Sequence, residues 1–229
     1  TENKPDWDEY NLNDTNYKHL FQKIIHEYSK KTPNNDPYKI FINNQIKEFL
    51  KNTKITDIDS FSASVGLGLI VKSASKLASK INDHDKVKNK IKLLIENTQM
   101  FLTVSDLSYA IKGGRVPKYK GVIARLLKMH PILTTDHEGK LKAASVLFGA
   151  SNLHLKFAQF ILKKLDKDSH YNISIAHSNA DEQGHEIVDV IENNFKNIIS
   201  IDLVEMGSAL GVHGGPNSFV AGIQKEINE

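Results

Sequence analysis

One glycine-rich stretch near the C-terminus combines residue types that suit the binding of an anionic ligand. It runs from Gly207 to Pro216 and reads GSALGVHGGP. Glycine lets a ligand approach the backbone closely, and clustered glycines leave N–H groups that can hold an anion. His213 is the one side chain there whose charge changes near neutral pH. The stretch predicts an anion-binding loop, and an ordinary glycine-rich turn is the alternative.

A second candidate is the serine-containing stretch DSFSAS, which begins at Asp59. Ser60, Ser62 and Ser64 are candidate hydroxyl donors at the carboxyl end of a predicted strand, where ligands of open α/β sheets bind. Gly66 and Leu67 follow at the start of a helix whose small residues allow close approach to a sheet or a ligand. The alternative is an ordinary turn that caps this helix.

A third stretch, from Lys112 to Arg115, reads KGGR. Ser105 is the predicted N-cap of a short helix that ends at this glycine pair, since glycine commonly stops a helix in the left-handed conformation. The side chain of Arg115 suits pairing with a carboxylate or a phosphate.

Several classes of protein are disfavoured by what the sequence lacks. It has no cysteine, no HExxH motif, no GxSxG motif and no P-loop, and its 30 basic and 27 acidic residues nearly balance. Zinc hydrolysis, serine hydrolysis and nucleic-acid binding are therefore disfavoured. No apolar run approaches the roughly 18 residues of a membrane span, and the first residues have no apolar core typical of a signal peptide. We expect a cytoplasmic protein without a metal or cofactor.

The order of predicted elements indicates an α/β fold with two domains. Residues 1–98 are assigned to an N-terminal three-layer domain with a parallel sheet. Residues 99–229 are assigned to a C-terminal two-layer domain with a mixed sheet, because its elements read β-α-α-β-β-α-β-α-β-β. The strands predicted for this second domain are Met100–Val104, Pro131–Thr135, Leu141–Leu147, Ile173–Ala176, Ile198–Val204 and Phe219–Ile223.

These turns and the histidine stand among apolar segments. Such a combination suits a ligand with an anionic or polar head and an apolar body. Each methylene group that is buried would contribute about 0.8 kcal/mol, so a long acyl chain could bind tightly through burial alone.

Four stretches together resemble the DegV family of bacterial fatty-acid-binding proteins. They are Ile58–Gly68, Leu107–Arg115, the strand Pro131–Leu133 with its turn at Gly139, and Gly211–Pro216. They occur in order along most of the chain. The resemblance implies a two-domain α/β protein that holds one long-chain fatty acid in a tunnel between the domains.

The resemblance also implies a role and a site. Family members are the non-catalytic, lipid-presenting subunit of a bacterial fatty acid kinase, whose acyl phosphate product feeds phospholipid synthesis. The expected partners are a fatty acid and this kinase, with transient membrane contact and no nucleic acid. By resemblance, His213, Thr32 and Ser208 hold the carboxylate, and Lys112 and Arg115 face the partner. The residues that the resemblance places at the acyl tunnel and in its adjacent turn are Ser60, Ser62, Ser64, Gly66 and Leu67.

The sequence departs from the family pattern in three places. The family normally begins with a strand that ends in Asp-Ser, and no counterpart of it precedes Asp14. Near Thr32 and Asn43 the hydroxyl-rich segments of the family have almost no counterpart, and we expect that the loops carrying them are missing from the sequence. Val146 and Phe148 stand where the family usually has the basic residues associated with kinase contact. A lipid carrier with a different partner is therefore one alternative. The other is a small-molecule enzyme that uses His213 as acid and base beside Ser208 or Ser62.

Overall fold

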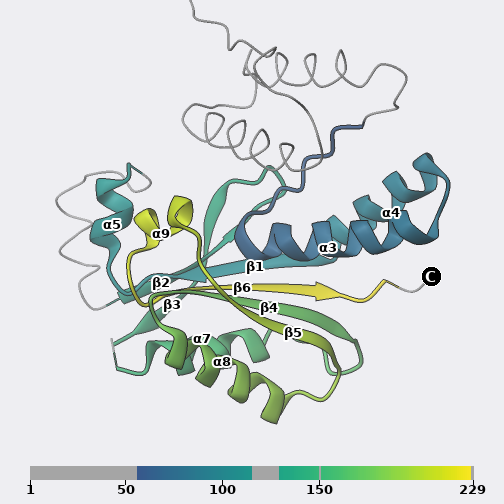
Figure 1. The fold of residues 1–229 in the computed structure, drawn as a ribbon. Coiled ribbons are helices and arrows are strands. Elements are labelled where there is room, and N and C mark those ends of the chain that lie inside the picture. The colour runs from purple at the N-terminus through teal and green to yellow at the C-terminus, as the bar shows by residue number, and fades with distance from the viewer. Residues whose placement is uncertain (1–55, 115–128, 150, 228–229) are drawn as a thin grey trace, which may run out of the picture. The chain divides into compact units, whose positions relative to one another are not determined.

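A six-stranded mixed sheet lies at the centre of the described part of the chain (Figure 1). The computed structural model describes residues 56–114, 129–149 and 151–227. The strands lie in the order β3-β2-β1-β6-β4-β5, with β4 and β5 parallel and the other neighbours antiparallel. The predicted mixed sheet is confirmed. Its strands are β1 (Thr98–Thr103), β2 (Met129–Thr135), β3 (Leu141–Phe148), β4 (Tyr171–Ser178), β5 (Ile198–Glu205) and β6 (Ser218–Lys225).

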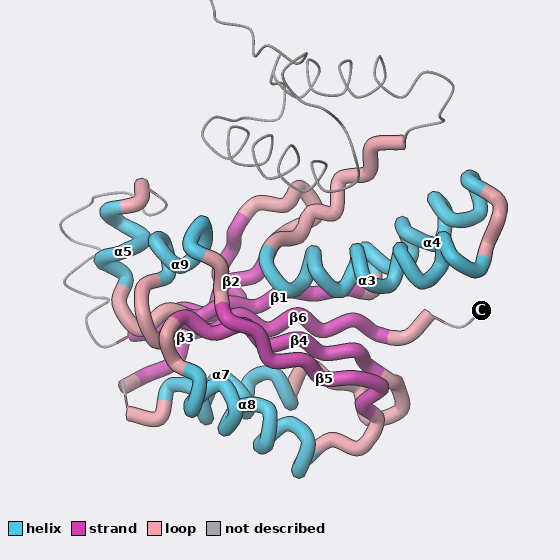
Figure 2. The backbone as a smooth tube through the Cα atoms, in the orientation of Figure 1, coloured by secondary structure: helices cyan, strands magenta, loops and turns pink. Residues whose placement is uncertain are grey.

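Helices cover both faces of this sheet, as Figures 1 and 2 show. Helix α3, followed by α4, lies over one face, and α7 and α8 lie over the other, while α5 and α9 lie together at one end. The sequence predicted two layers here, whereas the structure has three, because α3 had been assigned to the N-terminal domain. The helices are α3 (Ser64–Lys80), α4 (His84–Glu96), α5 (Leu107–Lys112), α7 (Leu153–Leu162), α8 (Asp181–Asn194) and α9 (Ser208–Gly214).

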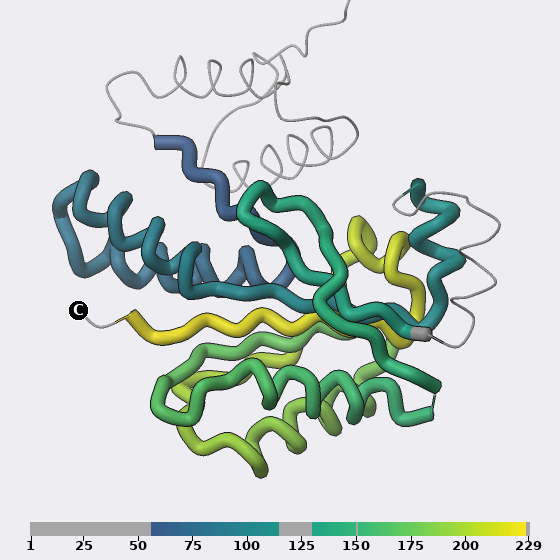
Figure 3. Tube along the Cα trace, turned by 180° about the vertical axis from the view of Figure 1, so that it is seen from behind, coloured from purple at the N-terminus to yellow at the C-terminus, as the bar shows by residue number. Residues whose placement is uncertain are grey.

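Strand β6 packs against the helices on both faces of the sheet, because successive side chains of a strand point to opposite faces. Phe219, Ala221 and Ile223 belong to the main core, which is built with α7 and α8. Val220 belongs to a smaller cluster under the start of α3. The view from behind in Figure 3 shows β6 between β1 and β4 in the middle of the sheet.

Helix α3 touches the sheet with almost no side chain between the two backbones. A Cβ atom at Gly222 would lie 3.0 Å from both Gly66 N and Val65 C, and one at Gly66 would lie 2.9 Å from Met100 Cβ. Real Cβ atoms essentially never come as close as 2.9 Å to another group, and 3.0 Å is tighter than most real Cβ contacts. Glycine at these two positions is therefore what lets α3 lie so close to β6.

A buried glutamine fixes where α3 lies along the sheet. Gln224 on β6 is 1% exposed, and its Oε1 accepts a hydrogen bond of 2.5 Å from Ser73 Oγ on α3. Its Nε2 donates to Thr98 Oγ1 on β1 over 2.9 Å. Buried polar groups are costly unless they are paired, so sliding α3 by one residue would leave this amide without its partner.

The chain divides into two compact units, Thr1–Asp57 and Ile58–Glu229. The sequence placed the domain boundary after residue 98, so the two divisions differ in where they put α3 and α4. Both helices contact the sheet of the second unit. The change of composition near Gln99 marks the start of β1 rather than the edge of a packed unit. The parallel sheet expected in residues 1–98 falls largely outside the described residues and stays a prediction.

Candidate functional site

The glycine-rich stretch near the C-terminus folds as the short helix α9. The Gly207 carbonyl oxygen accepts hydrogen bonds from the N–H groups of Leu210 (3.1 Å) and Gly211 (3.0 Å). The helix ends at Gly215, whose φ of 73° favours glycine. The predicted open loop is therefore wrong, because Ala209 and Leu210 are strong helix formers between glycines that start and stop the helix. The N–H groups of Leu210 and Gly211 bond within α9 and are therefore unavailable for an anion.

Helix α9 packs against α5, so the KGGR and GVHGGP motifs meet in space although they are far apart in sequence (Figure 1). The ring of His213 lies on Gly113, where a Cβ atom would come within 2.8 Å of His213 Cε1. The ring of Tyr109 lies on Gly215, where a Cβ atom would come within 2.7 Å of Tyr109 Cγ. Each glycine thus makes room for a ring from the other helix.

The start of α5 is held by an aspartate rather than by the predicted serine. Asp106 is the N-cap and accepts hydrogen bonds from the Ser108 hydroxyl (2.7 Å) and the Ser108 N–H (2.8 Å). These two bonds, the hydroxyl first, hold the pKa of Asp106 below its usual 3.8. Ser105 Oγ donates instead to Pro216 O over 2.7 Å. It therefore ties the start of α5 to the segment that follows α9.

The two ring nitrogens of His213 have different surroundings. Nδ1 is buried against Gly113 and has no hydrogen-bond partner among the described residues. Nε2 is not buried in this way. Of the two ring nitrogens in the described structure, Nε2 is therefore the better placed to contact a ligand.

The serine-containing turn before α3 has a strained backbone. Phe61 and Ser64 have φ angles of 49° and 52°, which are uncommon for residues that carry a Cβ atom. The Ser62 N–H donates to Ser60 Oγ over 3.3 Å. Ser62 Oγ lies against Gly66 and is buried without a hydrogen-bond partner among the described residues. Such strain and unpaired polar atoms call for a functional explanation, and the turn stays a candidate ligand contact.

An apolar cluster connects this turn with the segment that leads into α9. Its members come from the start of α3, from the central strands and from the residue before Gly207. They are Ala63, Val65, Met100, Leu102, Ala176, Met206 and Val220.

A groove of about 680 Å³ opens over this cluster between α3 and β5, and we call it the α3–β5 groove. Its rim carries the exposed ion pair between Lys72 Nζ and Asp202 Oδ2 (2.7 Å). Leu210 of α9, which is 40% exposed, also lines the groove. The groove is lined by Ser64, Val65, Gly68, Leu69, Lys72, Ser174, Ala176, Ile201, Asp202, Leu203, Val204, Glu205, Met206, Gly207 and Leu210.

The predicted site residues fall into separate groups. Ser64 lines the α3–β5 groove, whereas Gly66 faces the sheet and Leu67 is 39% exposed. Ser208 is the exposed first residue of α9, and Lys112 is exposed at the end of α5. Thr32 and Arg115 lie outside the described residues.

Three residues of the site were missed by the sequence reading. Met206 and Leu210 are apolar residues on either side of Gly207, and Tyr109 lies in the KGGR helix. They were not predicted because the site residues were chosen for their polar or titratable side chains. Their place after β5 and beside glycines was the available signal, because residues beyond the carboxyl ends of strands form the ligand sites of α/β sheets.

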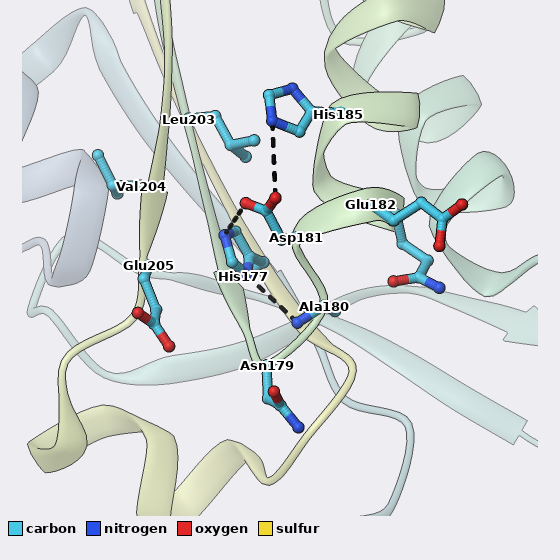
Figure 4. A pocket seen from close by; sticks show the side chains of 10 residues that line it. His177, Asn179, Ala180, Asp181, Glu182, His185, Leu203, Val204 and Glu205 are labelled. Atoms are coloured by element: carbon cyan, nitrogen blue, oxygen red, sulfur yellow. Dashed lines mark hydrogen bonds and ion pairs between the residues drawn. The ribbon is translucent and has the colours of Figure 1, made fainter.

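A second, more polar pocket lies at the carboxyl ends of β4 and β5 (Figure 4). Asp181 lies between two histidines, with Oδ1 3.3 Å from His177 Nε2 and Oδ2 3.8 Å from His185 Nε2. His177 is buried, and its Nδ1 accepts a hydrogen bond from the Ala180 N–H (3.3 Å). These bonds give His177 a structural role at the start of α8. The polar atoms of His177, His185 and Asp181 contact one another or the backbone, so they are not arranged around a shared ligand position.

No group of three or more histidine, cysteine, aspartate or glutamate residues is placed to hold a metal ion in the described part of the chain. No helix within the same residues has the length and apolar character needed to cross a membrane.

The fold and the site define a mixed-sheet α/β protein with an apolar groove beside a histidine-bearing helix. The chain belongs to the DegV family: the family's sequence model, described as an uncharacterised protein of the DegV family, matches residues 18–226. A DegV domain-containing protein of Clostridium perfringens is 30% identical over 169 residues, which cover 74% of this chain and 59% of that protein. The chain thus spans about three fifths of that relative's length.

Solved structures of the family show the same fold. A fatty acid binding DegV family protein of Streptococcus agalactiae is 25% identical with a TM-score of 0.66, over 80% of this chain and 64% of that one. The fatty acid kinase B3 protein of Streptococcus pneumoniae, solved with linoleic acid, is 20% identical with a TM-score of 0.69, over 82% and 66%. The predicted family and α/β fold are therefore confirmed.

Proposed function

We propose that this protein binds one long-chain fatty acid, with its acyl chain along the α3–β5 groove and its carboxylate near α9. The observation that carries the proposal is the apolar floor of this groove, which runs from the start of α3 to Leu210. Its volume of about 680 Å³ falls within the roughly 300–1,000 Å³ of typical ligand pockets. Binding would gain about 0.8 kcal/mol for each methylene group buried.

The proposed head-group contact is His213. Its Nε2 is the ring nitrogen open to a ligand, and a hydrogen bond to a carboxylate is stronger than one between neutral groups. Ser208 and Thr32 remain proposed contacts on the resemblance alone. The protein is then a binding protein without a catalytic step of its own, and we place it in the cytoplasm.

Extraction of the purified protein followed by mass spectrometry tests the proposal. We expect a co-purifying acid of roughly C14–C20, judged from the gain per methylene group. Leu210→Asp puts a carboxylate in the groove and should weaken fatty acid binding by at least about 1 kcal/mol, roughly fivefold. Val212→Asp is the matched control, because Val212 lies on the same helix, is 62% exposed and does not line the groove. Protein that carries no fatty acid, or equal losses in both variants, would contradict the proposal.

We further propose that the bound carboxylate is presented to a fatty acid kinase, as the name of the Streptococcus pneumoniae neighbour suggests. Lys112, exposed at the end of α5, and Arg115 are the proposed partner contacts. The test mixes lipid-loaded protein with a bacterial fatty acid kinase and ATP, and traps acyl phosphate with hydroxylamine. Trapped product supports the kinase role.

One observation favours a carrier with a different partner. Phe148 at the end of β3 is 68% exposed, the largest exposed fraction among the large apolar side chains of the described chain. An exposed aromatic ring of this kind suits a protein interface. Loaded protein that yields no acyl phosphate, but that gains the reaction after Phe148→Arg, would support this second candidate. The proposed acid–base enzyme has no such support, since Ser62 Oγ and His213 Nδ1 lack hydrogen-bond partners among the described residues.

A further inference from the structure

Helix α5 supplies a backbone surface against which His213 rests. Gly113 N–H donates to Tyr109 O over 2.8 Å, so Gly113 continues the helical turn at the end of α5. The imidazole ring lies on this turn, and a methyl group at residue 113 would overlap Nδ1 and Cε1. Tyr109, one turn earlier, packs on Gly215 just beyond the end of α9. Among the described residues, the ring is therefore held by packing on α5, and its Nδ1 has no hydrogen-bond partner there.

This packing decides which nitrogen can act. Nδ1 faces Gly113 and is buried with no partner among the described residues, while Nε2 is not buried. A neutral imidazole carries its proton on one nitrogen and a lone pair on the other. Only the form with hydrogen on Nε2 can donate to a carboxylate from the open side. It also leaves a lone pair, rather than an N–H, at the buried position.

We propose that Gly113 is a positioning residue for His213: it holds the imidazole so that Nδ1 faces α5 and Nε2, carrying the hydrogen, faces the ligand. This inference deepens the proposed function and rests on it. It gives the first glycine of KGGR a role besides ending α5. Any side chain at residue 113 pushes the imidazole off the surface of α5 and moves Nε2 away from the carboxylate.

The first test needs no lipid. Nitrogen-15 NMR of histidine-labelled protein distinguishes the two neutral forms, and the spectrum of His213→Ala identifies the His213 signals by their loss. We expect hydrogen on Nε2 in the wild type and changed His213 signals in Gly113→Ala. Gly211→Ala is the matched control on α9, because its new Cβ would meet only Ser178 Oγ at an ordinary 3.6 Å. Hydrogen on Nδ1 in the wild type, or unchanged His213 signals in Gly113→Ala, would overturn the inference.

The second test uses the double variant. If Gly113→Ala acts through the ring, then Gly113→Ala/His213→Ala regains the melting temperature that Gly113→Ala loses, because the overlapped ring is gone. For hexadecanoic acid, Gly113→Ala and His213→Ala should each lose affinity on the order of tenfold, and the double variant should lose no more than either. Losses that multiply, or a melting temperature that stays low, would overturn it. Absence of lipid binding by the wild type would refute the proposed function. The NMR experiment tests the packing of His213 on Gly113 independently of lipid binding.

Discussion

Replacing Gly222 by alanine tests the contact between α3 and the sheet. The new methyl carbon would lie 3.0 Å from Gly66 N and Val65 C and 3.1 Å from Gly66 Cα. These are backbone atoms, so no side chain can turn aside to make room. Overpacking of this kind typically costs about 1–3 kcal/mol. In a chain of this size each kcal/mol lowers the melting temperature by about 2–4 °C, so we expect a loss of about 2–12 °C.

The assay is thermal unfolding followed by circular dichroism, with Gly68→Ala as the control. Gly68 lies on α3, the helix that faces Gly222, and a Cβ atom at Gly68 would meet nothing within 4 Å. Its replacement by alanine should therefore stabilise the helix, by up to about 1 kcal/mol. Equal melting temperatures for Gly222→Ala and the wild type would refute the proposed close approach of α3 to β6.

Two further predictions concern hydrogen bonds in the same unit. Ser73→Ala leaves Gln224 Oε1 without its partner in a buried position and should destabilise the protein by about 1–3 kcal/mol in chemical denaturation; an unchanged midpoint would contradict the pairing. The folded pKa of Asp106 is lowered by its bonds to Ser108, so this cap stabilises α5 fully above its ordinary pKa of 3.8 and is lost as the pH falls from there through the lower folded pKa. Hydrogen exchange should show α5 losing protection on acidification, less steeply in Asp106→Asn, which can still cap the helix; identical pH profiles would refute this assignment.

Much of the sheet could be predicted from local patterns. The six strands of the described sheet follow predicted apolar runs, and β6 shows why these patterns are reliable. Its alternate residues fill cores on opposite faces, so nearly the whole strand is buried and its middle, Phe219–Ile223, is an uninterrupted run without a polar side chain. The hairpin at Gly139 also follows from local sequence, since its φ of 75° requires a residue such as glycine.

Long-range packing could not be predicted in the same way. The amphipathic pattern of α3 shows that it packs on something, but the contact at Gly222 depends on a residue more than a hundred positions away. Because α3 was assigned to the N-terminal domain, the predicted second domain had two layers instead of three. For the same reason, the packing of His213 on Gly113 was not predicted. Gly113 ends a helix by its local sequence, and its contact with the imidazole arises only when α5 and α9 meet.

The same limit applies to the candidate site. The polar residues Ser64 and His213 were proposed because their residue types suggest chemistry, and their roles stay predictions. The apolar residues Met206 and Leu210 were not, because an apolar residue on a groove and one in a core look alike in sequence. The Asp106 cap was missed because Ser105 and Asp106 are neighbouring residues that both suit the N-cap position.

The central claim is that this chain binds a fatty acid with its carboxylate at His213. Titration of the delipidated protein with hexadecanoic acid labelled with carbon-13 at the carboxyl group tests it most directly by NMR. We expect a bound carboxyl resonance that saturates at one equivalent and that shifts and weakens in His213→Ala but not in Val212→Asp. A titration that shows only unbound acid, or a bound resonance identical in His213→Ala, would contradict the account.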